Sequence, residues 1–192
     1  MNYQKNRLIY CCEVIFLKIL KKINGFFDRM EHDLRLFNFR PSIIIGCVSL
    51  ALGIFSWIVG GTTDKVTLIY LFPRSAISIG FMYFLWGLSF LFVGFVIGGI
   101  LFGCEKYKRR EALKIVLLIS LSYVFTLCVH PLFFRCLSPF IAFLFLLTAA
   151  FVCFFTIVAS LKLYSLWSLC LMLHLVWLLY NCYVAFAIAI IN

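Results

Sequence analysis

Five long runs of apolar residues make up most of this 192-residue chain and constrain its fold more than any other feature. A helix needs roughly 20 apolar residues to cross the hydrocarbon core of a bilayer. Hydrophobic residues are 65% of the chain and the mean hydropathy is +1.11, more apolar surface than a soluble domain of this size can bury. We therefore predict an all-α integral membrane protein, a single bundle whose five spanning helices lie at about 43–59, 76–102, 112–134, 140–161 and 163–192.

The charged residues are unevenly distributed, and their placement predicts an orientation. Most of the net charge of +10 lies in the first forty residues and between Cys104 and Lys114. With five spans and a cytoplasmic N-terminus, these segments and Lys162 lie inside, whereas the outer loops carry only Lys65, Arg74 and Arg135. The positive-inside rule therefore favours the N-terminus in and the C-terminus out. We interpret the charge as attraction to the anionic bilayer surface, with no role for nucleic acid.

Residues 1–41 form a basic extension in front of the five-helix domain at 42–192. Between Leu8 and Phe27 the apolar residues recur at helical spacing, while Glu13, Lys18 and neighbouring lysines fall on the other side. This pattern predicts an amphipathic helix on the cytoplasmic membrane surface, or, as the alternative, a helix packed on a partner protein. A signal peptide is not expected, because Glu13 and Lys18 interrupt its apolar core. A second short amphipathic turn is expected just before Arg40.

A glycine stripe marks the second run. Gly80, Gly87 and Gly94 repeat at seven-residue intervals, and Gly94 with Gly98 fits the G-x-x-x-G pattern. Such stripes let a neighbouring helix approach closely. The neighbour is either another helix of the same chain or the same helix of a second copy, so a homodimer through these four glycines is one of two open alternatives.

The last run carries polar groups on one helical face. Cys170, His174, Trp177, Asn181 and Ala185 follow one another at spacings of four, three, four and four. A polar side chain in a membrane needs a partner, so we expect this face to contact either other helices or a ligand. The alternative to a ligand site is hydrogen bonding between helices.

Catalysis and metal binding have little support in the sequence. The spans hold no deeply placed charge, and no acid accompanies either His130 or His174 for a Ser-His-Asp arrangement. The nine cysteines show no C-x-x-C pair. In the third run Ser122, Thr126 and His130 share a face, and Pro131 should kink or end the helix. We expect neither an enzyme nor a metal site, and no required cofactor.

Several of these elements together resemble the TspO/MBR family, the tryptophan-rich sensory proteins and mitochondrial translocator proteins. The run Val129–Phe134 (VHPLFF) is similar to the W-S-P-L-F-F end of that family's third helix. In the last run Trp177 falls on the family's Trp and His174 on its Tyr, and terminal Asn192 falls on its last Asn. Pro73 and the segment from Gly80 to Ser89 resemble its proline loop and second helix. The resemblance covers about 43–192.

The chain departs from the family at several of these positions. The replacements are Phe81 for Trp, Leu85 for Tyr, Thr126 for Asn, Val129 for Trp, Leu173 for Pro and Ala185 for Asn. The resemblance still implies a pocket for a flat hydrophobic ligand, a porphyrin, haem or sterol-like molecule, with Trp177 stacked on it. The expected ligand-binding residues are Trp177, His174, Asn181, Thr126, His130, Phe133, Phe134, Phe81 and Pro73.

The resemblance implies a protein that binds its ligand in a sensory, regulatory or transport role. The alternative is a divergent member without a ligand that acts as an interaction or regulatory subunit in the membrane. A membrane enzyme or a solute transporter is less favoured, because the spans lack ionisable groups. With no organelle signal and a basic cytoplasmic extension, the chain suits a bacterial inner membrane.

Overall fold

The computed structural model describes residues 2–35, 37–61, 70–74, 76–103, 109–161 and 164–192, all of them in helices or short connections. The helices are α1 (Asn2–Arg35), α2 (Phe39–Gly60), α4 (Ile79–Phe102), α5 (Arg109–His130), the π-helical turn η2 (Pro131–Arg135), α6 (Pro139–Ser160) and α7 (Ser165–Ile191). Five of them are long and apolar enough to cross a membrane, α5 together with η2 counting as one span. The prediction of an all-α protein with five candidate spans is confirmed.

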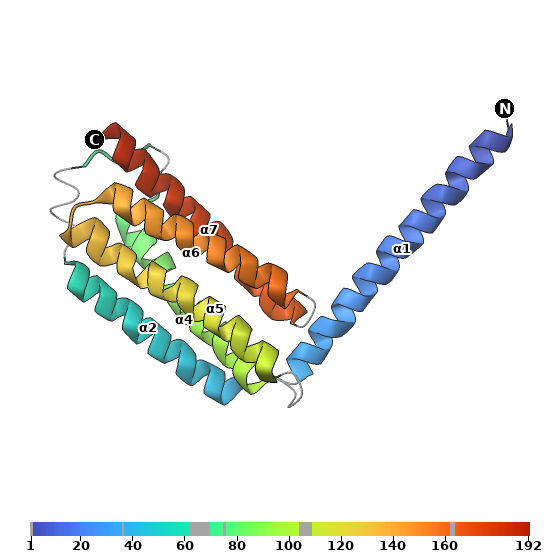
Figure 1. The fold of residues 1–192 in the computed structure, drawn as a ribbon, viewed down its shortest axis with the longest axis horizontal. Helices are drawn as coiled ribbons and strands as arrows, with labels where there is room; N and C mark the ends of the chain where they lie inside the picture. Colours follow the sequence, from blue (N-terminus) through green and yellow to red (C-terminus); the bar gives the residue numbers. More distant parts are fainter. Residues whose placement is uncertain (1, 36, 62–69, 75, 104–108, 162–163) are drawn as a thin grey trace.

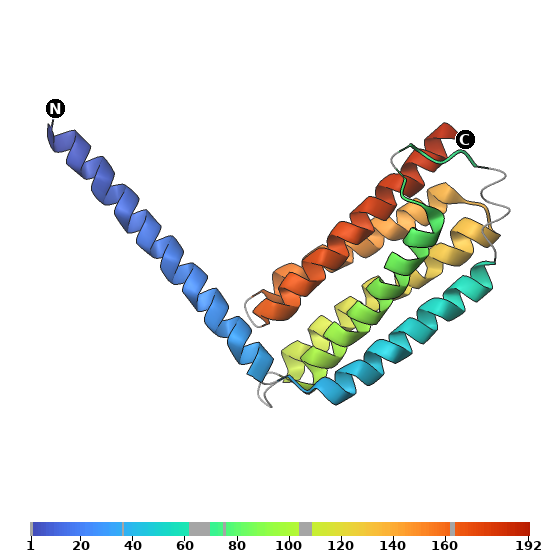
Figure 2. The ribbon, with the colours of Figure 1, turned by 180° about the vertical axis from the view of Figure 1, so that it is seen from behind.

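The spanning helices form a ring with one helix added outside it (Figures 1 and 2). In chain order α4, α5, α6 and α7 each pack on the next, and α7 returns to contact α4. Helix α2 packs on the outside of this ring, against α4 and α5. Contact is extensive between α2 and α4 and between α6 and α7, and sparser where α4 meets α5 and α7. The ring is therefore less tightly closed on both sides of α4.

Proline and glycine set several helix boundaries. Pro139 lies in the first turn of α6, where a missing N–H costs no helical bond. Gly61 ends α2 with φ +88°, a conformation that other residues rarely adopt. The second span begins at Ile79, later than the expected residue 76, because the backbone at Ser78 is still extended.

Pro131 ends α5 as expected and also leaves one backbone carbonyl of the helix without its usual donor. It has no N–H to donate to the carbonyl four residues earlier, which is that of Leu127. Ser56 of α2 donates its hydroxyl to this Leu127 oxygen at 2.5 Å. The chain continues as a π-helical turn in which Cys136 N–H donates to the Pro131 carbonyl. A neighbouring helix thus satisfies the backbone group that the proline leaves unpaired.

The glycine stripe of α4 packs within the chain. A side-chain carbon at Gly98 would lie 2.5 Å from Ser42 Cα, and one at Gly94 would lie 2.5 Å from Ser49 Cβ, both in α2. Gly87 also faces α2, whereas nothing lies within 4 Å of the same point at Gly80. Of the two alternatives left open by the sequence, close packing inside the chain is the one observed. A homodimer that uses Gly87, Gly94 and Gly98 would have to displace α2.

The residues of α2 that are buried are all small. Its buried residues are Ser42, Gly46, Ser49, Gly53, Ser56 and Gly60. Gly53 accommodates the ring of Phe90, and Ser49 donates to the Phe90 carbonyl at 2.8 Å. Small residues on both helices let the backbones approach, so dispersion contacts and hydroxyl-to-carbonyl bonds hold α2 on α4.

The N-terminal extension is a single helix in place of the expected amphipathic helix from Leu8 to Phe27 followed by a second short turn. Helix α1 runs from Asn2 to Arg35 and leaves the bundle at a steep angle (Figures 1 and 2). Its last turns contact the start of α7, where Arg29 Nε donates to Ser165 Oγ at 3.1 Å. The Asp33 carboxylate accepts the Leu166 N–H at 3.1 Å and so caps α7.

At the opposite end of the bundle, the connection before α4 is bound to α7. The Asn192 carboxamide accepts from Leu71 N–H at 2.8 Å and donates to the Leu71 carbonyl at 3.2 Å. Tyr180 Oη accepts the Ile77 N–H at 3.0 Å. The remaining predictions on the connections concern residues 62–69, 104–108 and 162–163, with Lys65 and Lys162 among them, and lie outside the described residues.

Candidate functional site

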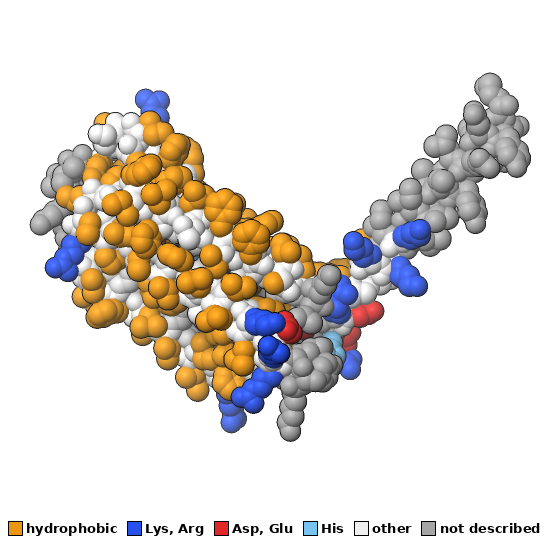
Figure 3. Space-filling model, viewed as in Figure 1, with side chains coloured by type: hydrophobic (Ala, Val, Ile, Leu, Met, Phe, Trp, Pro, Cys, Tyr) orange, Lys and Arg blue, Asp and Glu red, His pale blue; other side chains and the backbone are white. Residues whose placement is uncertain are grey.

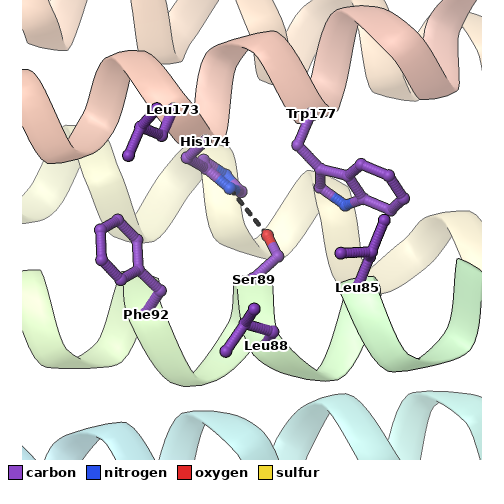
Figure 4. A pocket seen from close by; sticks show the side chains of 7 residues that line it. All are labelled: Leu85, Leu88, Ser89, Phe92, Leu173, His174 and Trp177. Carbon is purple, nitrogen blue, oxygen red and sulfur yellow. Dashed lines mark hydrogen bonds between the residues drawn. The ribbon is translucent and has the colours of Figure 1, made fainter. Parts of the chain in front are cut away.

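His174 lies at the α4/α7 seam and is the polar centre of the predicted site. Its Nδ1 is 2.9 Å from the Ser89 hydroxyl of α4, and the imidazole is 4% exposed (Figure 4). The polar face predicted for the last run is turned into the protein, since Asn181 and Ala185 are also buried. Helical spacing therefore placed this face correctly.

A hollow of about 450 Å³ lies beside this hydrogen bond, between α4 and α7. The residues that line it are Leu85, Leu88, Ser89, Phe92, Leu173, His174 and Trp177. Figure 4 shows these side chains projecting from the two facing helices, with the His174 and Ser89 side chains pointing toward each other. Leu88 and Leu173 are exposed on the outer surface of the bundle, so the hollow opens on the side that would meet lipid. Its volume is within the roughly 300–1,000 Å³ range of small-molecule pockets.

Two nitrogen atoms of the lining residues are buried without a hydrogen-bond partner. They are Nε2 of His174 and Nε1 of Trp177. A buried polar group without a partner costs about 1–3 kcal/mol, so such groups call for an explanation. The hollow is thus lined by apolar side chains together with two residues that each carry a buried, unsatisfied ring nitrogen. Sites for mostly apolar molecules are lined in this way, by apolar side chains with a few polar groups.

The indole of Trp177 lies in a chain of aromatic rings. It stacks on Tyr180 with centroids 5.6 Å apart and meets Trp86 edge-on at 5.9 Å. Trp86 is 5% exposed and contacts His130 in turn, with centroids 4.8 Å apart. This chain of rings connects the hollow to the interior of the bundle.

His130 is enclosed by aromatic rings and does not line the hollow. Its neighbours are the rings of Trp57, Trp86, Phe90 and Phe134. Its Nδ1 is buried without a partner, and the imidazole is 2% exposed. Gly60 packs closely on the backbone of His130, since a side-chain carbon at position 60 would lie 3.0 Å from the His130 carbonyl. The two histidines therefore occupy different environments.

The other predicted site residues lie away from the hollow. Thr126 donates to the Ser122 carbonyl at 2.9 Å and Asn181 to the Trp177 carbonyl at 2.7 Å, both within their own helices. Phe133 is buried in η2, where its ring meets that of Phe134 at 5.1 Å. Phe81 is 51% exposed and its ring contacts only Phe84 among the described rings.

Pro73 lies in the connection before α4, where its carbonyl accepts the Ala76 N–H at 2.9 Å. It too is absent from the lining of the hollow. Of the nine predicted residues the structure thus brings two, His174 and Trp177, together at one hollow. Phe134 joins His130 in the separate aromatic cluster.

Sequence patterns alone did not point to Ser89 or Trp86 as site residues. Ser89 is the partner of His174, and the Trp86 ring contacts the rings of both His130 and Trp177. Both lie on α4 three residues apart, and one signal was present: a serine and an indole on a single face of an otherwise apolar helix.

A second hollow of about 370 Å³ lies between α2 and α4. It is lined by Leu50, Trp57, Tyr83, Phe84, Gly87, Leu88 and Leu91. Its one buried nitrogen without a partner belongs to Trp57. Among the described residues no group of three or more His, Cys, Asp or Glu side chains could hold a metal ion.

Comparison with known proteins adds no assignment. No family model matches the chain, and no curated protein matches it.

Proposed function

We propose that this membrane protein binds a flat hydrophobic ligand, a porphyrin or a sterol-like molecule, in the hollow between α4 and α7. The observation that carries the proposal is the pair of buried, unpartnered nitrogens, His174 Nε2 and Trp177 Nε1, at an otherwise apolar hollow that opens at the seam. A ligand dissolved in the bilayer could enter sideways, without crossing the connections at either end.

Each lining residue then has a distinct task. The Trp177 indole offers a ring face for stacking and an N–H donor for an acceptor on the ligand. When the Ser89 hydroxyl donates to His174 Nδ1, the imidazole proton lies on Nε2 and can be donated to a ligand carboxylate. In the other tautomer Nε2 is an acceptor and could approach the iron of a haem. Leu85, Leu88, Phe92 and Leu173 supply the apolar wall.

A divergent relationship to the TspO/MBR family is part of this proposal. Its support is the set of five candidate spans, a hollow against the last of them, and Trp177 at the position of that family's Trp. In this reading the protein senses, regulates or transports its ligand in a bacterial inner membrane.

The proposed orientation places the N-terminus in the cytoplasm and α1 at the membrane interface. Lys and Arg side chains gather on α1 and around the end of the bundle that it joins, while apolar side chains cover the flank (Figure 3). Helix α1 carries Leu20, Ile23, Phe27 and Leu34 exposed at helical spacing, with lysines on its other side. These features support an interfacial helix on the positive-inside face.

The same four exposed side chains of α1 favour a second candidate function. A projecting helix with an apolar stripe suits a regulatory subunit that binds a partner protein and needs no ligand. The two candidates differ in a direct way, because only the first depends on the α4/α7 hollow.

The test is a titration of the purified protein in detergent with protoporphyrin IX, followed by quenching of tryptophan fluorescence. Trp177→Phe and His174→Phe are compared with Trp57→Phe, which alters the α2/α4 hollow and also removes one of the four tryptophans. The proposal expects saturable binding that the first two variants weaken about tenfold and Trp57→Phe leaves unchanged. Quenching without saturation, or equal effects of all three, would refute it and favour the partner-binding candidate.

A further inference from the structure

A third hollow lies where α1 leaves the bundle, and its lining differs from that of the other two. It has a volume of about 500 Å³ and is lined by Lys21, Lys22, Gly25, Phe26, Arg29 and Leu161. Three of these six residues are cationic, and none of the described residues that line it is acidic. The space exceeds what a few water molecules need at about 30 Å³ each, so it can hold a headgroup-sized anion.

The arrangement of α1 explains why the cations gather there. Lys21, Gly25 and Arg29 repeat every four residues, which places them on one face of the helix, beside Lys22 and Phe26. The exposed apolar side chains Leu20, Ile23 and Phe27 lie on another face. The helix therefore directs a basic surface to the hollow and keeps its apolar stripe elsewhere.

Gly25 keeps the hollow open. No atom of the described residues lies within 4 Å of the point where a side-chain carbon would be at this position. A glycine in the middle of a helix lowers helix stability by roughly 0.5–1 kcal/mol relative to alanine. Open space at a glycine between basic residues suits the close approach of a ligand to the helix backbone.

Two contacts fix α1 beside the bundle. Arg29 Nε donates to Ser165 Oγ at 3.1 Å, and the guanidinium has further N–H donors on its terminal nitrogens. The Asp33 carboxylate accepts the Leu166 N–H at 3.1 Å. Of the acids close by in the sequence, Glu31 pairs with Arg35 at 2.6 Å, and Asp28 is exposed and does not line the hollow.

We propose that this hollow binds the phosphate headgroup of an anionic phospholipid. Lys21, Lys22 and Arg29 would contact the phosphate oxygens, and Phe26 with Leu161 would pack against the glycerol region. The position fits this ligand, since the hollow lies at the end of two spanning helices, α6 and α7, where lipid headgroups surround a membrane protein. The site is independent of the α4/α7 hollow and of the ligand proposed for it.

The test measures lipid retention on the full chain in detergent by native mass spectrometry, with phosphatidylglycerol and phosphatidylcholine as the two probes. Lys21→Gln with Lys22→Gln removes two charges from the hollow and leaves Arg29 to hold α1. The control, Lys18→Gln with Arg40→Gln, removes two exposed charges from the basic N-terminal segment outside the lining of the hollow and breaks no ion pair. Gly25→Leu fills the hollow at unchanged charge, and leucine is the better helix former.

The proposal expects preferential retention of phosphatidylglycerol, weakened about tenfold by the Lys21/Lys22 double variant and by Gly25→Leu, and unchanged by the control. Equal losses in both double variants would mean general surface attraction and would overturn it, as would equal retention of the two lipids. Inorganic phosphate distinguishes the source of the anion. Displacement of the lipid by millimolar phosphate would contradict a lipid site and indicate a site for the free ion.

Discussion

His174 and Ser89 join α7 to α4 through a hydrogen bond of 2.9 Å at a seam of the ring where the two helices are in sparse contact. The bond occupies Nδ1 of the imidazole and leaves Nε2 buried without a partner beside the hollow. One nitrogen of the imidazole therefore joins α7 to α4, and the proposed function gives the other nitrogen a partner on the ligand.

Ser89→Ala tests the structural half of this arrangement. The variant removes the partner of Nδ1, and hydrogen bonds between membrane helices contribute about 0.6 kcal/mol on average, with a maximum near 1.7. We expect the free energy of unfolding in detergent to fall by roughly 1 kcal/mol, because the imidazole then has two unpaired nitrogens. The matched control is Thr148→Ala, whose hydroxyl bonds only to the Leu144 carbonyl of its own helix and is exposed. Equal effects of the two variants would mean that the His174–Ser89 bond does not hold the seam.

The two histidines should respond differently to the same change. His174→Phe is expected to weaken porphyrin binding about tenfold, because the imidazole lines the hollow and its Nε2 has no hydrogen-bond partner within the protein. His130→Phe should leave binding unchanged and should preserve or raise the melting temperature, since it removes an unpaired nitrogen from a cage of aromatic rings. The measurement is a porphyrin titration and a thermal melt of both variants. A loss of binding in His130→Phe alone would contradict the account, because it would place the ligand in the aromatic cluster around His130 and not in the α4/α7 hollow.

Gly98→Ala should destabilise the protein while Gly80→Ala should not. A methyl group at Gly98 would lie 2.5 Å from Ser42 Cα, so α2 would have to move, at a cost of about 1–3 kcal/mol. At Gly80 nothing lies within 4 Å, and alanine is the better helix former. Thermal melts and the mass of the protein–detergent complex are measured together. A lower mass with unchanged stability would show that the glycines join two copies rather than α2 and α4.

Ser56→Ala and Pro131→Ala form a double-mutant cycle. Ser56→Ala alone should cost about 1–2 kcal/mol of unfolding free energy, because the Leu127 carbonyl loses its donor. With alanine at 131 the backbone N–H can donate to that carbonyl, so the same change should cost less. Unfolding of the four proteins gives the coupling directly. Equal costs in the two backgrounds would mean that proline and serine are independent.

The spans could be predicted from the sequence because the length of an apolar run is a local property. The observed helix boundaries differ from the predicted ones where local backbone conformation determines them. Helix α4 begins at Ile79 after an extended Ser78, and α5 passes into a π-helical turn at Pro131. The glycine stripe of α4 could be recognised in the sequence, but the helix that packs on it could not. Such a stripe shows only that some helix packs closely there. The answer was visible in α2, whose Ser and Gly residues recur every three or four positions on one face.

Helical spacing identified some residues of the candidate site and missed others. His174 and Trp177 could be found because they share a face of an apolar helix. Ser89 is 85 residues away from His174, and its role depends on the register between α4 and α7, which no local pattern encodes. Thr126 and Asn181 lie on predicted faces but bond to their own helices, a choice that spacing does not reveal.

The central claim is that a flat hydrophobic ligand binds between α4 and α7, and photolabelling tests it most directly. A diazirine-bearing porphyrin would be crosslinked to the protein in detergent, with and without excess protoporphyrin IX, and the labelled residues read by peptide mass spectrometry. We predict labels at Leu85, Leu88, Phe92 and Leu173, all suppressed by the excess ligand. Labels confined to the Leu50–Trp57 side of α2, or spread evenly over all five spans and insensitive to competition, would contradict the account.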